Sequence, residues 1–243
     1  MEAILYICHG SRVKSARDEA LAFVEKCKEV RREEILQHCF LELAEPTIFQ
    51  GIERCVEQGA TKIRAIPVLL LTANHAIVDI PNEVNRAKQH FPQLEIQLSE
   101  PIGVHPLLID LLVERIQQTN QEVTSQSKVL LIGRGSTNGR VKRDLSEIAS
   151  ELSEKISHPV DVCFLTGCEP YFSDKIATLD LRDVDKVLIL PYFLFTGILI
   201  EGIQKTVEKA AENHDCQFII CEHLGHSPLV VEALNERIEE VFS

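Results

Sequence analysis

Residues Ile4 to Arg12 read ILYICHGSR, and residues Leu130 to Asn138 repeat the same pattern as LLIGRGSTN. Each copy is a short apolar run that ends in a turn containing Gly-Ser, with Gly10 and Gly135 in the same place. A run of this kind is typical of a strand buried in a parallel sheet and followed by a helix. The same strand and turn are therefore predicted once in each half of the chain.

The repeat extends through both halves of the 243-residue chain. CFLELAEP at 39–46 returns as CFLTGCEP at 163–170, and IPVLLLTANHAIV at 66–78 returns as LPYFLFTGILIEG at 190–202. IGVHPLLIDLLVERI at 102–116 returns as LGHSPLVVEALNERI at 224–238. A duplication of this length predicts two similar units of roughly 120 residues each. We expect an N-terminal domain at 1–119 and a degenerate C-terminal domain at 127–243, joined by the polar stretch QQTNQEVTSQS.

Apolar runs alternate with amphipathic stretches in both halves, which predicts an α/β fold of two four-stranded parallel sheets flanked by helices. The expected strands lie near 3–8, 35–43, 62–71 and 94–98, and then near 128–132, 160–165, 186–190 and 217–221. The expected helices lie near 15–30, 46–58, 80–90 and 106–118, and then near 141–156, 170–178, 200–213 and 228–241.

Charge and composition exclude several classes of partner. The formal net charge of -12 argues against nucleic acid and anionic membranes, since both need a clustered basic surface. No apolar run reaches the roughly 18 residues that span a bilayer, and the first residues lack the pattern of a signal peptide. We therefore expect a cytoplasmic protein. The eight cysteines are scattered without a Cys-x-x-Cys pair, so reduced core thiols are expected rather than disulfides or metal ligands.

Three polar residues of the first copy are absent from the second. His9 follows the first strand, Glu42 lies at the end of the second and His75 lies in the loop beyond the third. The second copy has Arg134, Thr166 and Leu199 in these places. Because the carboxyl ends of parallel strands meet at one edge of a sheet, the three side chains should converge. Two imidazoles and a carboxylate suit a divalent ion such as Fe, Co, Ni or Zn and leave coordination positions open.

The Gly-Ser turn is a candidate anion site in both halves. Gly10, Ser11 and Arg12 follow His9, and Gly135 and Ser136 follow Arg134. Backbone amides at a helix start attract anions, and an arginine binds carboxylate or phosphate. The chain has neither a Walker sequence nor a Gly-x-Gly-x-x-Gly turn, so ATP and NAD are not implied.

The segments LLLTANHAI and FLFTGILI, which follow the third strand of each half, are unusually apolar for loops. They are interpreted either as continuations of the strand into the core or as an apolar wall for a large flat ligand. The acidic residues Asp79, Glu83 and Glu100 are expected on solvated helix faces or at caps. Glu201, at the head of a helix, is a weaker candidate for the site.

Three motifs in combination resemble the sirohydrochlorin chelatases, the class II chelatase family of siroheme and cobalamin biosynthesis. They are HGSR after the first strand, FLELAEPT after the second, and PVLLLTANHAIVDIPNE around the third. The resemblance extends over both halves, because long members of the family also carry a degenerate second copy. It implies two similar α/β domains with the tetrapyrrole in the cleft between them. It also implies that His9 and His75 are metal-binding and catalytic, with Glu42 as the acidic metal ligand.

The function that the resemblance implies is a lyase that inserts Fe(II) into sirohydrochlorin to make siroheme without ATP. The metal is then a substrate, and no permanently bound cofactor is expected. Cobalt-specific long members with histidine-rich tails or cysteine clusters differ from this chain, which favours iron over cobalt. A cobaltochelatase, a metal or tetrapyrrole carrier without turnover, and a zinc hydrolase with the same three ligands stay open as alternatives. The ligand types do not rank Fe, Co and Ni, and both a monomer and a homodimer fit the sequence.

Overall fold

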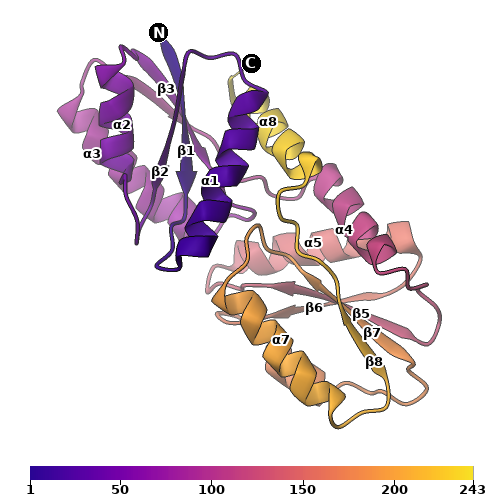
Figure 1. The fold of residues 1–243 in the computed structure, drawn as a ribbon. Coiled ribbons are helices and arrows are strands. Elements are labelled where there is room, and N and C mark those ends of the chain that lie inside the picture. The colour runs from indigo at the N-terminus through magenta and orange to yellow at the C-terminus, as the bar shows by residue number, and fades with distance from the viewer. Residues whose placement is uncertain (243) are drawn as a thin grey trace. The chain divides into compact units, whose positions relative to one another are not determined.

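The computed structural model describes residues 1–242 and divides the chain into two compact units. Unit 1 contains Met1–Gly103 and, of the described residues, 231–242, and unit 2 contains Val104–Val230. Each unit has one sheet of four parallel strands flanked by helices (Figure 1). The predicted α/β fold of two similar, duplicated domains is confirmed.

The sheet of unit 1 has the strand order β2-β1-β3-β4. Its strands are β1 (Glu2–Cys8), β2 (Ile35–Phe40), β3 (Lys62–Pro67) and β4 (Glu95–Leu98). Its helices are α1 (Lys14–Glu29), α2 (Ile48–Glu57), a π-helical turn η1 (His75–Asp79) and α3 (Ile80–His90).

The central position of β1 explains its unbroken apolar run. Leu5 and Ile7 belong to a buried cluster that includes Ile52 of α2 and Ala87 of α3, so these helices cover one face of the sheet. The neighbouring residue Tyr6 is also fully buried, and α1 lies on the other side of the sheet (Figure 1). A strand that is covered on both faces needs apolar side chains at every position.

Unit 2 repeats this plan with the strand order β6-β5-β7-β8. Its strands are β5 (Ser127–Gly133), β6 (Val160–Phe164), β7 (Lys186–Pro191) and β8 (Gln217–Ile220). Its helices are α4 (Pro106–Gln118), α5 (Gly139–Ile156), α6 (Phe172–Ala177) and α7 (Ile198–Ala211). The last helix, α8 (Pro228–Phe242), begins at the end of unit 2 and belongs to unit 1 from Val231.

The compact units therefore divide the chain differently from the expected domains 1–119 and 127–243. The last helix of each repeat belongs to the unit built on the other repeat: α4 lies beside α5 in unit 2, and most of α8 is in unit 1. Both helices have an apolar stripe that must be buried, but the stripe does not specify which of two similar sheets receives it.

Two equivalent arginines show that the exchange is reciprocal. Arg115 of α4 donates from Nη2 to the carbonyl of Leu224 at 2.9 Å within unit 2. Arg237 of α8 donates from Nη2 to the carbonyl of Ile102 at 2.6 Å within unit 1. The repeats align Arg115 with Arg237 and Ile102 with Leu224, so each exchanged helix makes the same contact in its new unit.

The segment after β3 fits neither sequence interpretation alone. The strand ends at Pro67, earlier than the expected 62–71, and the carbonyls of Leu69 and Leu70 accept hydrogen bonds from the amides of Ile102 and Gly103. Leu69 packs on the core while remaining partly exposed.

Among residues 1–242, no helix is both long and apolar enough to cross a bilayer.

The cysteines lie mainly in the two cores, as their apolar settings predicted. Six of the eight are buried, and Cys168 and Cys216 are partly exposed. Burial raises the pKa of the Cys8 thiol to about 12, so this neighbour of His9 is a protonated core residue near neutral pH.

Candidate metal centre

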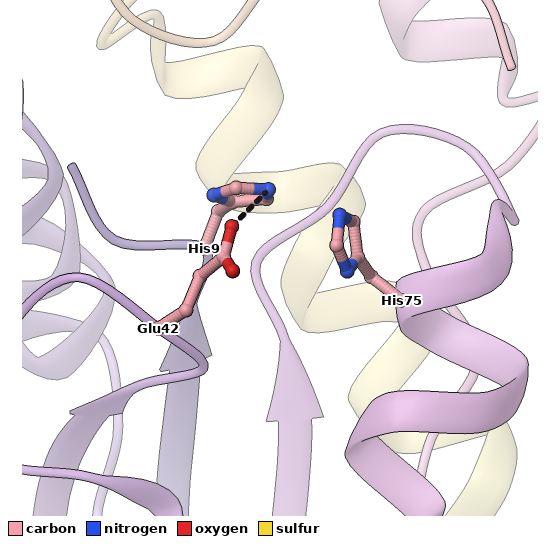
Figure 2. A group of neighbouring side chains, drawn as sticks. All are labelled: His9, Glu42 and His75. Atoms are coloured by element: carbon pink, nitrogen blue, oxygen red, sulfur yellow. Dashed lines mark ion pairs between the residues drawn. The ribbon is translucent and has the colours of Figure 1, made fainter.

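The three predicted metal ligands come together in unit 1 (Figure 2). His9 follows β1 directly, Glu42 lies two residues beyond β2, and His75 is the first residue of η1 after β3. Because β1 pairs in parallel with both β2 and β3, the carboxyl ends of all three strands share one edge of the sheet. The topology thus brings together residues that are up to 66 positions apart in sequence.

The ligand atoms are close to the spacing that one ion requires. His9 Nε2 lies 3.6 Å from Glu42 Oε1, and one ligand atom from each of the three residues lies within 4.8 Å of the others. The imidazoles of His9 and His75 meet edge to face, with centroids 4.7 Å apart. Ligands bound to one ion at about 2.0–2.2 Å stand about 3 to 3.5 Å from each other. Small side-chain movements would therefore close the three groups around a cation.

Hydrogen bonds on the far side of each ring orient the two imidazoles. His9 Nδ1 lies 3.1 Å from the carbonyl oxygen of Gly10, and His75 Nδ1 lies 2.8 Å from Asp79 Oδ2. A carbonyl oxygen and an ionised carboxylate only accept, so the neutral form of each ring carries its proton on Nδ1. The lone pair is then on Nε2, which is the atom that a metal ion would use.

Glycine at position 10 allows the first two loops to touch. Gly10 has φ +93°, and a β-carbon there would lie 1.8 Å from the carbonyl oxygen of Glu42. The Glu42 amide donates to the carbonyl of His9 at 3.1 Å, which ties the backbones of the two ligands together. The glycine in HGSR is therefore required by the close approach of these loops.

The serines of the two Gly-Ser turns serve the local backbone. Ser11 Oγ accepts from the amide of Val13, and Ser136 Oγ accepts from the amide of Asn138, both at 3.1 Å. Arg17, which the sequence did not single out, donates to the carbonyl of Ser11 at 2.8 Å and so fixes the loop that follows His9. Arg12 and Arg134 are exposed.

Unit 2 keeps this loop architecture without the ligands. Gly135 has φ +86°, its β-carbon would lie 1.9 Å from the carbonyl oxygen of Thr166, and the Thr166 amide donates to the carbonyl of Arg134. Arg134, Thr166 and Leu199 occupy the places of His9, Glu42 and His75. A guanidinium, a hydroxyl and an alkyl group do not form a divalent-ion site of the same kind.

Three exposed apolar residues lie within three positions of a ligand in sequence, and we call Leu43, Ile77 and Val78 the apolar rim. Their exposed fractions are 46%, 43% and 48%, which is high for large apolar side chains in a folded chain. Leu43 also has φ +61°, at a position where unit 2 has Gly167 with φ +76°. A branched residue at positive φ is strained, and such strain is concentrated at functional sites.

The sequence missed the contact between His75 and Asp79, because the acid was expected on a solvated helix face or at a cap. Asp79 is the last residue of η1, and its carboxylate lies against the imidazole of His75. The spacing of four residues between a histidine and an acid is the signal that could have identified this pair.

Two imidazoles and one carboxylate on one edge of a parallel α/β sheet could together hold a divalent metal ion. A family model described as CbiX matches residues 3–119 and 128–241, and the chain therefore belongs to the CbiX family. This match confirms the resemblance to class II chelatases in both repeats.

Similar proteins are metal chelatases. The sirohydrochlorin ferrochelatase of Priestia megaterium is 43% identical over 244 residues, which cover 100% of this chain and 91% of that protein. The sirohydrochlorin cobaltochelatase of the same organism is 32% identical over 246 residues, which cover 99% of this chain and 80% of that protein. The solved structure described as SirB from Bacillus subtilis with Fe3+ aligns with a TM-score of 0.89 and 39% identity, over 99% of this chain and 95% of that one.

Proposed function

We propose that this protein is a sirohydrochlorin ferrochelatase, which inserts Fe(II) into sirohydrochlorin without a nucleotide. The observation that carries the proposal is the cluster of His9, Glu42 and His75 in a chain that matches a ferrochelatase along its whole length. Both imidazoles and the carboxylate are about one quarter to one half exposed, so the site is open to a large partner. The metal is a substrate in this reaction, and it must leave the protein at each turnover.

The three ligands suit the two tasks of metal insertion. The ion must first lose water, and His9, Glu42 and His75 replace water molecules on one side while leaving the other side open to the ring. Two pyrrole protons must then leave the tetrapyrrole as the ion enters it. Once the ion has been transferred, the lone pairs of the imidazoles and of the carboxylate are no longer shared with the metal and can accept these protons.

We propose that the apolar rim contacts the face of the tetrapyrrole. Its three members are next to or within a few residues of the ligands, and burial against a flat ring would remove their apolar surface from water. The strain at Leu43 supports this role, because glycine is the residue that suits its backbone and stands there in unit 2.

Leu43→Gly should raise the KM for sirohydrochlorin roughly fivefold, since burying the exposed half of a leucine is worth about 1 kcal/mol. The melting temperature should not fall, because glycine relieves the positive φ. Leu43→Ala should raise KM similarly while keeping the strain. Steady-state kinetics and thermal melts of both variants test this, and an unchanged KM in both would exclude Leu43 from ring binding.

In unit 2 we propose that Arg134, with the amides of Gly135 and Ser136, binds a peripheral carboxylate of the tetrapyrrole. In unit 1, Gly10, Ser11 and Arg12 form the equivalent anion-binding turn. A guanidinium cannot coordinate a cation, but it makes strong paired hydrogen bonds to carboxylates. This division assigns the metal to unit 1 and substrate carboxylates to the turns of both units.

Arg134→Ala should raise the KM for sirohydrochlorin about tenfold, because a hydrogen bond to a charged group contributes about 1.5 kcal/mol. The apparent affinity for the metal should stay the same. Arg140→Ala is the matched control, since Arg140 is also exposed and its removal changes the net charge equally. Kinetics with each substrate varied in turn decide this, and a change in the metal dependence alone would contradict the assignment.

The proposed function is tested by adding sirohydrochlorin with Fe(II), Co(II) or Ni(II) to the purified protein without oxygen. We expect the absorption change of metallation to be faster than in protein-free controls, and fastest with Fe(II). Faster insertion of Co(II) would make the protein a cobaltochelatase, a function that the 32% identical relative supports. Binding without acceleration for every ion would instead indicate a carrier. A stoichiometric zinc ion that resists chelators would favour the hydrolase alternative.

A further inference from the structure

Asp79 is within hydrogen-bond distance of the candidate metal ligand His75. Its Oδ2 lies 2.8 Å from His75 Nδ1, and the two residues are the first and last of the π-helical turn η1. The Ile80 amide donates to the carbonyl of His75, which is the hydrogen bond between residues five apart that defines this turn. Single π-helical turns within helices occur frequently at functional sites. Here the turn brings an acid and an imidazole onto the same side of the helix.

The two repeats differ at both residues of this pair. Alignment of IPVLLLTANHAIV with LPYFLFTGILIEG places His75 opposite Leu199, and the next position aligns Asp79 with Ile203. Ile203 is fully buried in α7, which runs as an α-helix from Ile198. The carboxylate is thus present in the copy that has the histidine and replaced by a core residue in the copy that lacks it.

A contribution to the stability of the fold does not explain why Asp79 and His75 are paired. The Asp79 side chain is 48% exposed and that of His75 is 29% exposed, and an ion pair this exposed to solvent contributes little to the stability of the fold. A carboxylate on the remote nitrogen of a metal-binding histidine has a different effect. It holds the ring at one orientation, keeps the proton on Nδ1, and makes Nε2 a stronger donor to the metal.

The two histidines differ in how they are held. His9 Nδ1 faces the carbonyl of Gly10, a backbone group that no side-chain substitution removes. In His75 the partner of Nδ1 is a side chain, the carboxylate of Asp79. His75 also lies on a π-helical turn and not directly after a strand. The orientation of His75 is therefore sensitive to a single residue outside the three ligands.

We propose that Asp79 is a positioning residue that orients His75 for metal binding through its Nδ1 hydrogen bond. This inference rests on the proposed role of His75 as a metal ligand. It assigns no direct contact with the ion to Asp79, and it predicts that the residue affects the metal step and not the binding of the ring.

The test is a titration of the full-length protein with Co(II) alone, followed by its visible absorption bands. Asp79→Ala should weaken Co(II) binding about tenfold, which is the lower end of the effects of such outer partners. Asp79→Asn, which can still accept the hydrogen bond but lacks the charge, should lie between Asp79→Ala and the parent, and Asp79→Glu should restore part of the affinity. In turnover, the KM for the metal should rise and that for sirohydrochlorin should not.

Two controls separate positioning from other effects. Glu83→Gln removes one negative charge on the next turn of the helix, beside Arg86, and should leave Co(II) binding unchanged. In a His75→Ala background, Asp79→Ala should cause no further loss, because a residue that acts through the imidazole has nothing left to position.

The outcomes distinguish a failure of the positioning role of Asp79 from a failure of His75 as a metal ligand. If His75→Ala weakens Co(II) binding and Asp79→Ala does not, the positioning role is wrong and the metal site stands. If His75→Ala has no effect, the assignment of His75 as a ligand fails, and the positioning role fails with it. An equal loss in Glu83→Gln, or a further loss from Asp79→Ala in the His75→Ala protein, would show a general charge effect or direct coordination and would overturn the proposal.

Discussion

His9→Ala and His75→Ala should each slow metal insertion at least about a hundredfold while leaving the fold intact. Each imidazole is both a ligand that strips water from the ion and a base for a pyrrole proton, and loss of general base catalysis alone costs about a hundredfold or more. Both side chains are partly exposed and lie outside the buried cores, so alanine creates no cavity. The measurement is the initial rate of metallation together with circular dichroism.

His214→Ala is the matched control for these variants. His214 is exposed in unit 2, and its replacement should leave the insertion rate unchanged. Glu42→Ala should weaken the apparent affinity for the metal more than that for sirohydrochlorin, because the carboxylate supplies negative charge to the ion. A folded His9→Ala or His75→Ala protein with a nearly normal rate would remove that residue from the site. A Glu42→Ala protein with unchanged metal affinity would do the same for the carboxylate.

Local sequence patterns predicted most of the secondary structure. The expected helices at 80–90 and 106–118 coincide with α3 and α4, and the other elements differ by a few residues at their ends. The duplication predicted two similar four-stranded sheets. The structure has both, and their strand orders are equivalent. The exchange of α4 and α8 was not predictable in this way. Each helix has the same apolar stripe and the same arginine, so either sheet could bury either helix, and the choice depends on the whole chain.

The ligand set was predictable because strand ends determine where side chains converge. His9, Glu42 and His75 each follow a strand, and parallel pairing places all three at one edge. The contact of Asp79 with His75 was not predicted, because an acid near a helix start has an ordinary role as a cap or surface residue. The orientation of the Asp79 side chain depends on the π-helical turn His75–Asp79, which lies before the expected helix at 80–90. The strain at Leu43 was likewise invisible, since a backbone dihedral is set by the surrounding loop.

Gly10→Ala should abolish most of the activity, about a hundredfold or more, through backbone geometry alone. The new β-carbon would lie 1.8 Å from the carbonyl oxygen of Glu42, so the loops that carry His9 and Glu42 must separate. A displacement of about 1 Å in a reacting group is enough for a loss of this size. Co(II) binding, followed by visible absorption, should weaken at least about tenfold, because two of the three ligands would no longer reach one ion.

Two other glycines separate this effect from a general loss of stability. Gly59 has φ +91° but its nearest neighbour would be 3.5 Å from the new β-carbon, so Gly59→Ala measures the backbone strain without the clash. Gly135→Ala reproduces the clash in unit 2, with 1.9 Å to the carbonyl oxygen of Thr166. Both controls should lower the melting temperature. The backbone strain in Gly59→Ala should reduce the free energy of unfolding by about 1–3 kcal/mol, and the clash in Gly135→Ala should reduce it further. Both should still bind Co(II) like the parent protein at a temperature where they are folded, because the ligands in unit 1 are untouched. Weakened Co(II) binding in Gly135→Ala, or normal binding in Gly10→Ala, would show that the contact between the first two loops does not set the geometry of the metal site.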